Sequence, residues 1–131
     1  MIGLDTNVLV RFLLTDDTLQ GRQASELVGS LTANDPGWAA VATILELVWV
    51  LSSKNRFDRQ TIARTLDRLL LQEEIVVENA EYVYEAVRLF RKGNADFADC
   101  LIASSGRAAG CSRTVTFDRM AARDAGMQLL G

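Results

Sequence analysis

The sequence contains no histidine. This absence excludes catalysis by a histidine general acid or base, the Ser-His-Asp and Cys-His nucleophile systems, and zinc sites with histidine ligands. Hydrolytic chemistry in this chain would therefore have to use carboxylates, and we expect a metal ion to assist them.

Cysteines and long apolar runs are also scarce. Only Cys100 and Cys111 are present, and we expect both to be small buried hydrophobic residues. There is no run of eighteen apolar residues and no signal peptide, which predicts a cytoplasmic protein without membrane contact. Internal repeats, domain linkers, glycine-rich phosphate loops and Cys/His metal spacings are absent as well. We expect residues 1–131 to form a single domain.

The formal net charge is −3. This value argues against non-specific polyanion binding by the whole surface, but it is compatible with a local basic rim. Charge alone identifies no partner.

Short apolar strands alternate with segments of helical periodicity. Strands are expected before Asp5 and over 38–41, 75–77, 114–117 and 127–130. Helices are expected between Asp5 and Leu14 and over 19–31, 39–51, 58–71, 80–92, 95–105 and 119–125. The helix over 58–71 is amphipathic, with Arg59 among the charges on its solvated face. The alternation predicts an α/β fold, with a parallel sheet covered by helices and ligand groups at the carboxyl ends of the strands.

Asp5 lies where the first strand ends and the first helix begins. Rigid backbone on both sides would hold its carboxylate in place for chemistry. The alternative is structural, since Asp5 or Thr6 can simply cap the helix N-terminus. Asp118 directly follows the strand over 114–117 and repeats this arrangement.

Glu46 is the only charged residue of the apolar segment 39–51. We expect this helix to be buried all round, so that the Glu46 carboxylate must be paired, protonated or bound to a cation. A structural ion pair with a distant arginine is the alternative.

Asp96 and Asp99 are three residues apart at the start of a predicted helix. This spacing places both side chains on one helix face, about 5–6 Å apart at Cβ. Asp96 can be explained as an N-cap, whereas Asp99 lies inside the helix beside apolar residues, where capping does not explain it.

If the four candidate carboxylates (Asp5, Glu46, Asp99 and Asp118) converge, each pair about 4 Å apart repels by about 4 kcal/mol at an effective dielectric of about 20. Protonation or a divalent cation must offset this repulsion, and Mg²⁺ or Mn²⁺ suits a site of oxygen ligands. The nucleophile would be a metal-bound water oriented by a carboxylate. Asn7 and Thr116 are candidates for orienting the ligands, and Arg11 and Arg119 for phosphate contacts.

Four motifs together resemble the PIN-domain family, specifically VapC-type toxins of bacterial toxin–antitoxin systems. They are Leu-Asp-Thr-Asn-Val-Leu-Val at 4–10, the helix that carries Glu46, Asp-Phe-Ala-Asp-Cys-Leu-Ile-Ala at 96–103 and Thr-Phe-Asp-Arg at 116–119. The resemblance spans essentially the whole chain. It implies a three-layer α/β/α domain with a central parallel sheet of about four to five strands.

The resemblance also implies an activity and its partners. It implies Mg²⁺- or Mn²⁺-dependent cleavage of structured RNA such as transfer or ribosomal RNA. It further implies a homodimer inhibited by a VapB-type antitoxin, with DNA contacted only through that antitoxin. Matched by position, the catalytic and metal-binding set falls on Asp5, Glu46, Asp99 and Asp118, with Asp96 as an auxiliary ligand.

Three other interpretations remain open. One is a PIN-like RNA-processing nuclease that is not a toxin. Another is a phosphotransfer module, although Asn7 stands where a haloacid-dehalogenase-like phosphatase has a second aspartate, and no lysine lies late enough for a receiver domain. The third is a non-catalytic binding module, which would have no reason to hold mutually repelling carboxylates.

Overall fold

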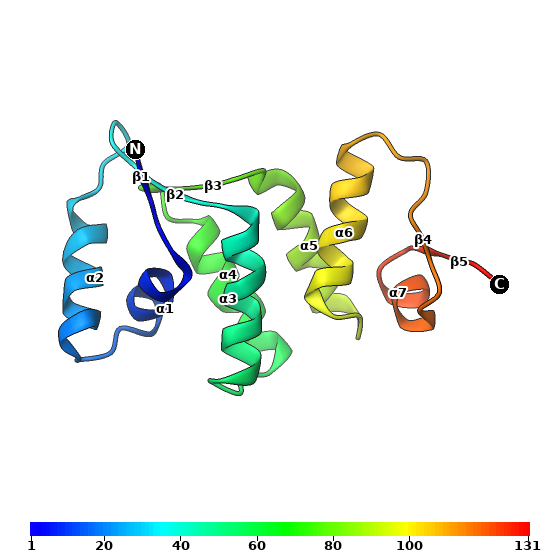
Figure 1. Cartoon of the computed structure of the whole chain (residues 1–131), viewed down its shortest axis with the longest axis horizontal. Helices are drawn as coiled ribbons and strands as arrows, with labels where there is room; N and C mark the ends of the chain where they lie inside the picture. The colour runs from blue at the N-terminus through cyan, green and yellow to red at the C-terminus, as the bar shows by residue number, and fades with distance from the viewer.

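The computed structural model describes residues 1–131, which form five short strands and seven helices (Figure 1). The strands are β1 (Ile2–Gly3), β2 (Gly37–Ala39), β3 (Ile75–Val77), β4 (Val115–Thr116) and β5 (Gln128–Leu129). The helices are α1 (Thr6–Leu14), α2 (Leu19–Ser30), α3 (Val41–Ser53), α4 (Arg59–Leu70), α5 (Ala80–Lys92), α6 (Phe97–Ala108) and α7 (Arg119–Asp124). None of the helices has the length and apolar character needed to cross a bilayer.

The strands form two separate parallel sheets. The first has the order β1-β2-β3, and the second is the pair β4-β5. The predicted α/β class and alternation of elements are confirmed. The arrangement of the strands differs from the expected single central sheet, because α5 and α6 lie between the two sheets (Figure 1).

The core is one cluster formed by the inner faces of the helices and the first sheet. Its largest fully buried side chains include Leu9, Ile44, Leu47, Leu66 and Val87. Across the turn between α5 and α6, Phe90 and Phe97 meet edge to face, with ring centroids 5.7 Å apart. Aromatic packing of this kind fixes the angle at which α6 leaves the turn.

Helix α3 is buried on one side only. Ile44, Leu47 and Leu51 face the core, whereas Leu45, Trp49 and Glu46 are exposed. The prediction that this helix is buried all round, with Glu46 inside it, is therefore wrong. The side of α3 that carries these exposed residues is open to solvent.

The two cysteines lie in different environments. Cys100 is buried, and loss of hydration raises the pKa of its thiol to about 11. Cys111 is exposed in the loop after α6, so the expectation that both cysteines are buried is wrong for Cys111.

The molecule is extended along one axis (Figure 1). Its accessible surface is 7672 Å². A compact monomer of this mass would expose about 6,800 Å². The chain therefore exposes more surface than a compact monomer of the same mass.

Candidate active site

Asp5 follows β1 and caps α1. Its Oδ1 accepts a hydrogen bond from the Thr6 N–H at 2.8 Å, and the side chain is exposed. Asp5 therefore caps the helix N-terminus, which was the structural alternative to a role in chemistry. It is compatible with ligand binding, because this bond uses only one carboxylate oxygen.

Asp5 and Glu46 line one surface hollow of about 580 Å³ between α1 and α3, here called the carboxylate groove. Its lining consists of Asp5, Thr6, Asn7, Val10, Arg11, Glu46, Trp49, Val50, Lys54 and Asn55. A larger hollow of about 810 Å³ beside α5 and α6 contains only one carboxylate, Glu81. The carboxylate groove is therefore the hollow that matches the predicted chemistry.

The basic side chains that line the groove differ from the two arginines, Arg11 and Arg119, that the sequence suggests as phosphate contacts. Arg11 forms an ion pair with Asp16, with Nη1 and Oδ2 2.6 Å apart, so its charge is already partly offset. Lys54 also lines the groove and forms no ion pair. The sequence interpretation missed Lys54, because nothing in the local pattern indicates that the end of α3 approaches α1.

Asp96, Asp99 and Asp118 form a second group, here called the acidic cluster. The Asp96 carboxylate caps α6 by accepting from the Asp99 N–H at 2.9 Å. Burial raises the pKa of Asp99, and the negative charges of Asp96 and Asp118 raise it further. Asp99 therefore lies close enough to Asp96 and to Asp118 for their charges to disfavour its ionised form.

Asp118 caps α7 through Oδ1, which accepts from the N–H groups of Met120 at 2.7 Å and Ala121 at 3.0 Å. The Thr116 hydroxyl accepts from the Asp118 N–H at 3.0 Å. Thr116 thereby orients Asp118 through the backbone rather than through its carboxylate. Arg119 is exposed at the first position of α7, beside Asp118.

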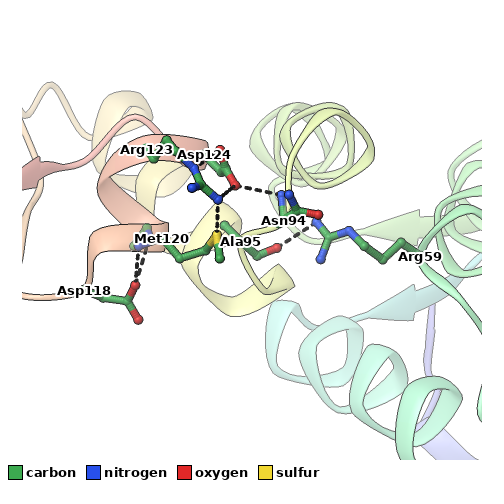
Figure 2. A network of polar contacts seen from close by, with 8 residues as sticks. Arg59, Asn94, Ala95, Asp118, Met120, Arg123 and Asp124 are labelled. Carbon is green, nitrogen blue, oxygen red and sulfur yellow. Dashed lines mark hydrogen bonds and ion pairs between the residues drawn. The ribbon is translucent and has the colours of Figure 1, made fainter.

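Arg59 reaches from α4 to the backbone that precedes the acidic cluster (Figure 2). Its Nη2 donates to the carbonyls of Phe90 at 2.6 Å and Ala95 at 2.8 Å, and its guanidinium lies 3.9 Å from the centre of the Phe90 ring. Because Ala95 directly precedes Asp96, these bonds fix where α6 begins. The prediction that Arg59 belongs to a solvated face is therefore wrong; the first turn of α4 packs against the α5–α6 turn.

The carboxylate groove and the acidic cluster do not merge within one chain. The elements that carry them follow one another along the long axis in the order α1, α3, α6, α7 (Figure 1). No three acidic or cysteine side chains lie close enough together to hold one metal ion. The oxygen donors suit Mg²⁺ or Mn²⁺ in kind, but a single chain does not assemble the expected four-carboxylate set.

The sequence matches the family model of the PIN domain over residues 2–126. The chain therefore belongs to the PIN-domain family. A protein of Aquifex aeolicus (strain VF5) named "VapC ribonuclease" is 26% identical over 116 residues, which cover 88% of this chain and 86% of that protein. The family recognised from the four motifs is confirmed, and this similarity agrees with the VapC type.

Substituting Arg59 by methionine should lower the free energy of unfolding by about 2–4 kcal/mol, because two backbone carbonyls lose a charged donor. Urea unfolding measures the change. Arg64→Met is the matched control, since the exposed hydrogen bond of Arg64 is made to Thr61 of its own helix. Equal stability of the two variants would contradict the role assigned to Arg59.

Substituting Asp99 by asparagine should stabilise the fold at pH 7. The pKa of Asp99 is higher in the folded chain than in the unfolded chain, so ionisation costs stability as the pH rises through the folded pKa. The gain should vanish below about pH 3, where the aspartate is protonated in both states.

Urea midpoints at the two pH values measure this difference. The exposed Glu46→Gln variant serves as the control and should show a smaller change. A destabilised Asp99→Asn variant at pH 7 would refute the argument that burial and the neighbouring carboxylates disfavour the ionised form of Asp99.

Proposed function

We propose that this protein is a metal-dependent endoribonuclease, the toxin component of a VapBC-type toxin–antitoxin system. The observation that carries the proposal is the PIN-domain match over residues 2–126 together with carboxylates at its motif positions. Asp5 and Asp118 each follow a strand, and Asp99 lies in the first turn of a helix. Such positions hold side chains on rigid backbone.

The proposed catalytic residues are Asp5, Glu46, Asp99 and Asp118, with Asp96 as an auxiliary ligand. A divalent Mg²⁺ or Mn²⁺ ion would neutralise their charge and supply an activated water. Asn7 lines the groove beside Asp5 and is proposed to orient the ligands there. The reaction would be hydrolysis of an RNA phosphodiester bond.

The lining of the carboxylate groove supports RNA as the substrate. Trp49 is 60% exposed on this groove and offers a face on which an unpaired base can stack. Lys54, which forms no ion pair, is placed to contact a phosphate. Arg11 and Arg119 are weaker candidates for this role, Arg11 because Asp16 already neutralises it.

The proposed partners are a VapB-type antitoxin and a second copy of the chain, and the proposed location is the cytoplasm. Support comes from the similarity to the Aquifex VapC ribonuclease. Cleavage of RNA in vitro without growth inhibition on expression would instead favour a PIN-like RNA-processing nuclease.

Substituting Asp5 or Asp99 by asparagine should lower RNA cleavage by at least about 100-fold, because each change removes a charged oxygen ligand. Excess chelator should have the same effect on the wild type, and Mn²⁺ should restore activity. Mapping of RNA 5′ ends identifies the cleaved bond. The matched control, Asp17→Asn, changes an exposed aspartate outside both carboxylate groups. Full activity of Asp5→Asn or Asp99→Asn would refute the proposal.

Substituting Lys54 by glutamine should raise KM for RNA several-fold while kcat changes little, because a phosphate contact acts on ground state and transition state alike. The effect should diminish at high salt. The control is Lys92→Gln at the end of α5, away from the groove. A fall in kcat at constant KM would place Lys54 in the chemistry rather than in binding.

A further inference from the structure

A small hollow lies at the end of α6, apart from both groups of carboxylates. It has a volume of about 100 Å³ and is lined by Ala103, Arg107, Cys111, Ser112, Arg113, Thr114 and Gly126. These residues belong to the second half of α6, the loop that leads to β4 and the segment between α7 and β5 (Figure 1). Arg107 follows Asp99 by eight residues on α6, which separates the hollow from the acidic cluster by about 12 Å along the helix axis.

The lining of the hollow carries two positive charges and no negative charge. Arg107 and Arg113 line it, whereas no aspartate or glutamate does. Neither guanidinium forms an ion pair. Arg113 donates from Nη1 to the side-chain oxygen of Gln128 at 3.0 Å, and this neutral acceptor leaves the charge of Arg113 uncompensated. Two cations at one hollow repel each other, so the lining favours an anionic ligand.

Glu85 of α5 is the acidic residue whose carboxylate is influenced by Arg107. Its hydrogen bonds with Arg88 are the main cause that lowers the pKa of Glu85, and the charge of Arg107 lowers it further. Glu85 is already engaged in the ion pair with Arg88. The guanidinium of Arg107 therefore remains available to a ligand.

A structural role for Arg107 is the alternative, because an arginine in the last turn of a helix stabilises the negative end of the helix dipole. However, the carbonyls of Ser105 and Gly106 at this end already accept from N–H groups of the following loop at 2.9 and 3.0 Å. Arg113 lies in that loop and outside the helix. The dipole therefore does not explain why two guanidinium groups line the same hollow.

Further hydrogen-bond donors accompany the two arginines. Ser112 and Thr114 contribute hydroxyl groups to the lining, and the N–H groups of Ser112, Arg113 and Thr114 donate to no backbone carbonyl. Arginine forks and successive N–H groups without an internal acceptor are typical components of phosphate sites. The volume corresponds to about three water molecules of about 30 Å³ each, which suits one phosphate group but not a nucleoside.

A glycine allows the walls of the hollow to approach each other. A Cβ on Gly106 would lie only 2.7 Å from Oγ1 of Thr114, so the loop reaches α6 because this position has no side chain. On the other side, Nη1 of Arg107 would lie 3.7 Å from a Cβ on Gly126, which is ordinary contact. The arginine and the hydroxyl groups are thus held around the same space by packing between α6 and the segments on both sides of α7.

We propose that this hollow binds a phosphate group, with Arg107 and Arg113 as the charged donors and the hydroxyl groups of Ser112 and Thr114 beside them. The phosphate is either a free phosphate ion or a phosphodiester of a nucleic-acid backbone, since both present the same anionic oxygens. The site is separate from the carboxylates proposed to cleave RNA, and the inference does not depend on that function.

Cys111 reports on occupancy of the hollow, because it lines the hollow and is exposed, whereas Cys100 is buried. Alkylation of Cys111 by iodoacetamide is followed by mass spectrometry in inorganic phosphate and in sodium chloride of equal ionic strength. The reagent is uncharged and does not compete for the arginines. We expect phosphate to slow alkylation several-fold, by covering the thiol and by placing negative charge beside it. Equal rates in phosphate and chloride would overturn the proposal.

The double variant Arg107→Gln/Arg113→Gln should lose this protection, because it removes both charged donors. The matched control, Arg22→Gln/Arg64→Gln, removes two exposed arginines of α2 and α4 and should keep it. Each variant is compared with itself with and without phosphate, so a change in the intrinsic reactivity of Cys111 cancels. Protection that persists in the first variant, or that is lost in the control, would contradict the assignment.

Single-stranded RNA distinguishes the two sources of the phosphate group. An oligonucleotide is added with excess chelator, so that no cleavage occurs. Protection by RNA at concentrations where inorganic phosphate has no effect, lost in the Arg107→Gln/Arg113→Gln variant, identifies the nucleic-acid backbone. Protection by inorganic phosphate that RNA does not match identifies a free phosphate, and protection by neither overturns the proposal. None of these measurements uses RNA cleavage, so a failure of the nuclease function would leave their outcome unchanged.

Discussion

Negative charges placed at strand ends and helix starts must be compensated, because each close pair costs several kcal/mol in a partly buried setting. The structure meets this constraint by using Asp5, Asp96 and Asp118 as N-caps, where backbone N–H groups and the helix dipole stabilise a carboxylate. Asp99 has no such cap, and it is the member of the acidic cluster whose pKa is raised. Capping is therefore compatible with the ligand role proposed for these side chains, since a cap uses only part of a carboxylate's capacity to accept.

The acidic cluster depends in turn on Arg59. This side chain connects α4 to the end of α5 and to the residue that precedes Asp96, and it does so with charged hydrogen bonds and a contact with the Phe90 ring. The Phe90–Phe97 contact adds a second support at the same turn. A carboxylate pair at the start of a helix can be placed accurately only when the start of that helix is itself held. The packing of Arg59, Phe90 and Phe97 between α4, α5 and α6 thus supports the site, although none of these three side chains is acidic.

Much of the fold could be predicted from periodicity and turn residues. The bounds of β3 and α5 agree with the prediction to the residue, and the other elements agree within a few residues. The failures concern side-chain environments. Glu46 was expected in the interior because its neighbours are apolar, but apolar composition does not state which faces of a helix find a partner. Cys111 and Arg59 were misplaced for the same reason, since exposure depends on packing between elements distant in sequence.

The candidate carboxylates, their order along the chain, the α/β class and membership of the PIN-domain family follow from the sequence, because strand ends, helix starts and motif spacing are local properties. Tertiary structure alone decided how those carboxylates are distributed. Asp5 and Glu46 share a groove because α1 packs beside α3, whereas Asp99 and Asp118 lie together because the β4-α7-β5 unit docks on the α5–α6 turn. Which strands pair at the edge of a sheet depends on residues that are far apart in the sequence. Because alternative pairings can have similar local energies, no local pattern specifies the pairing.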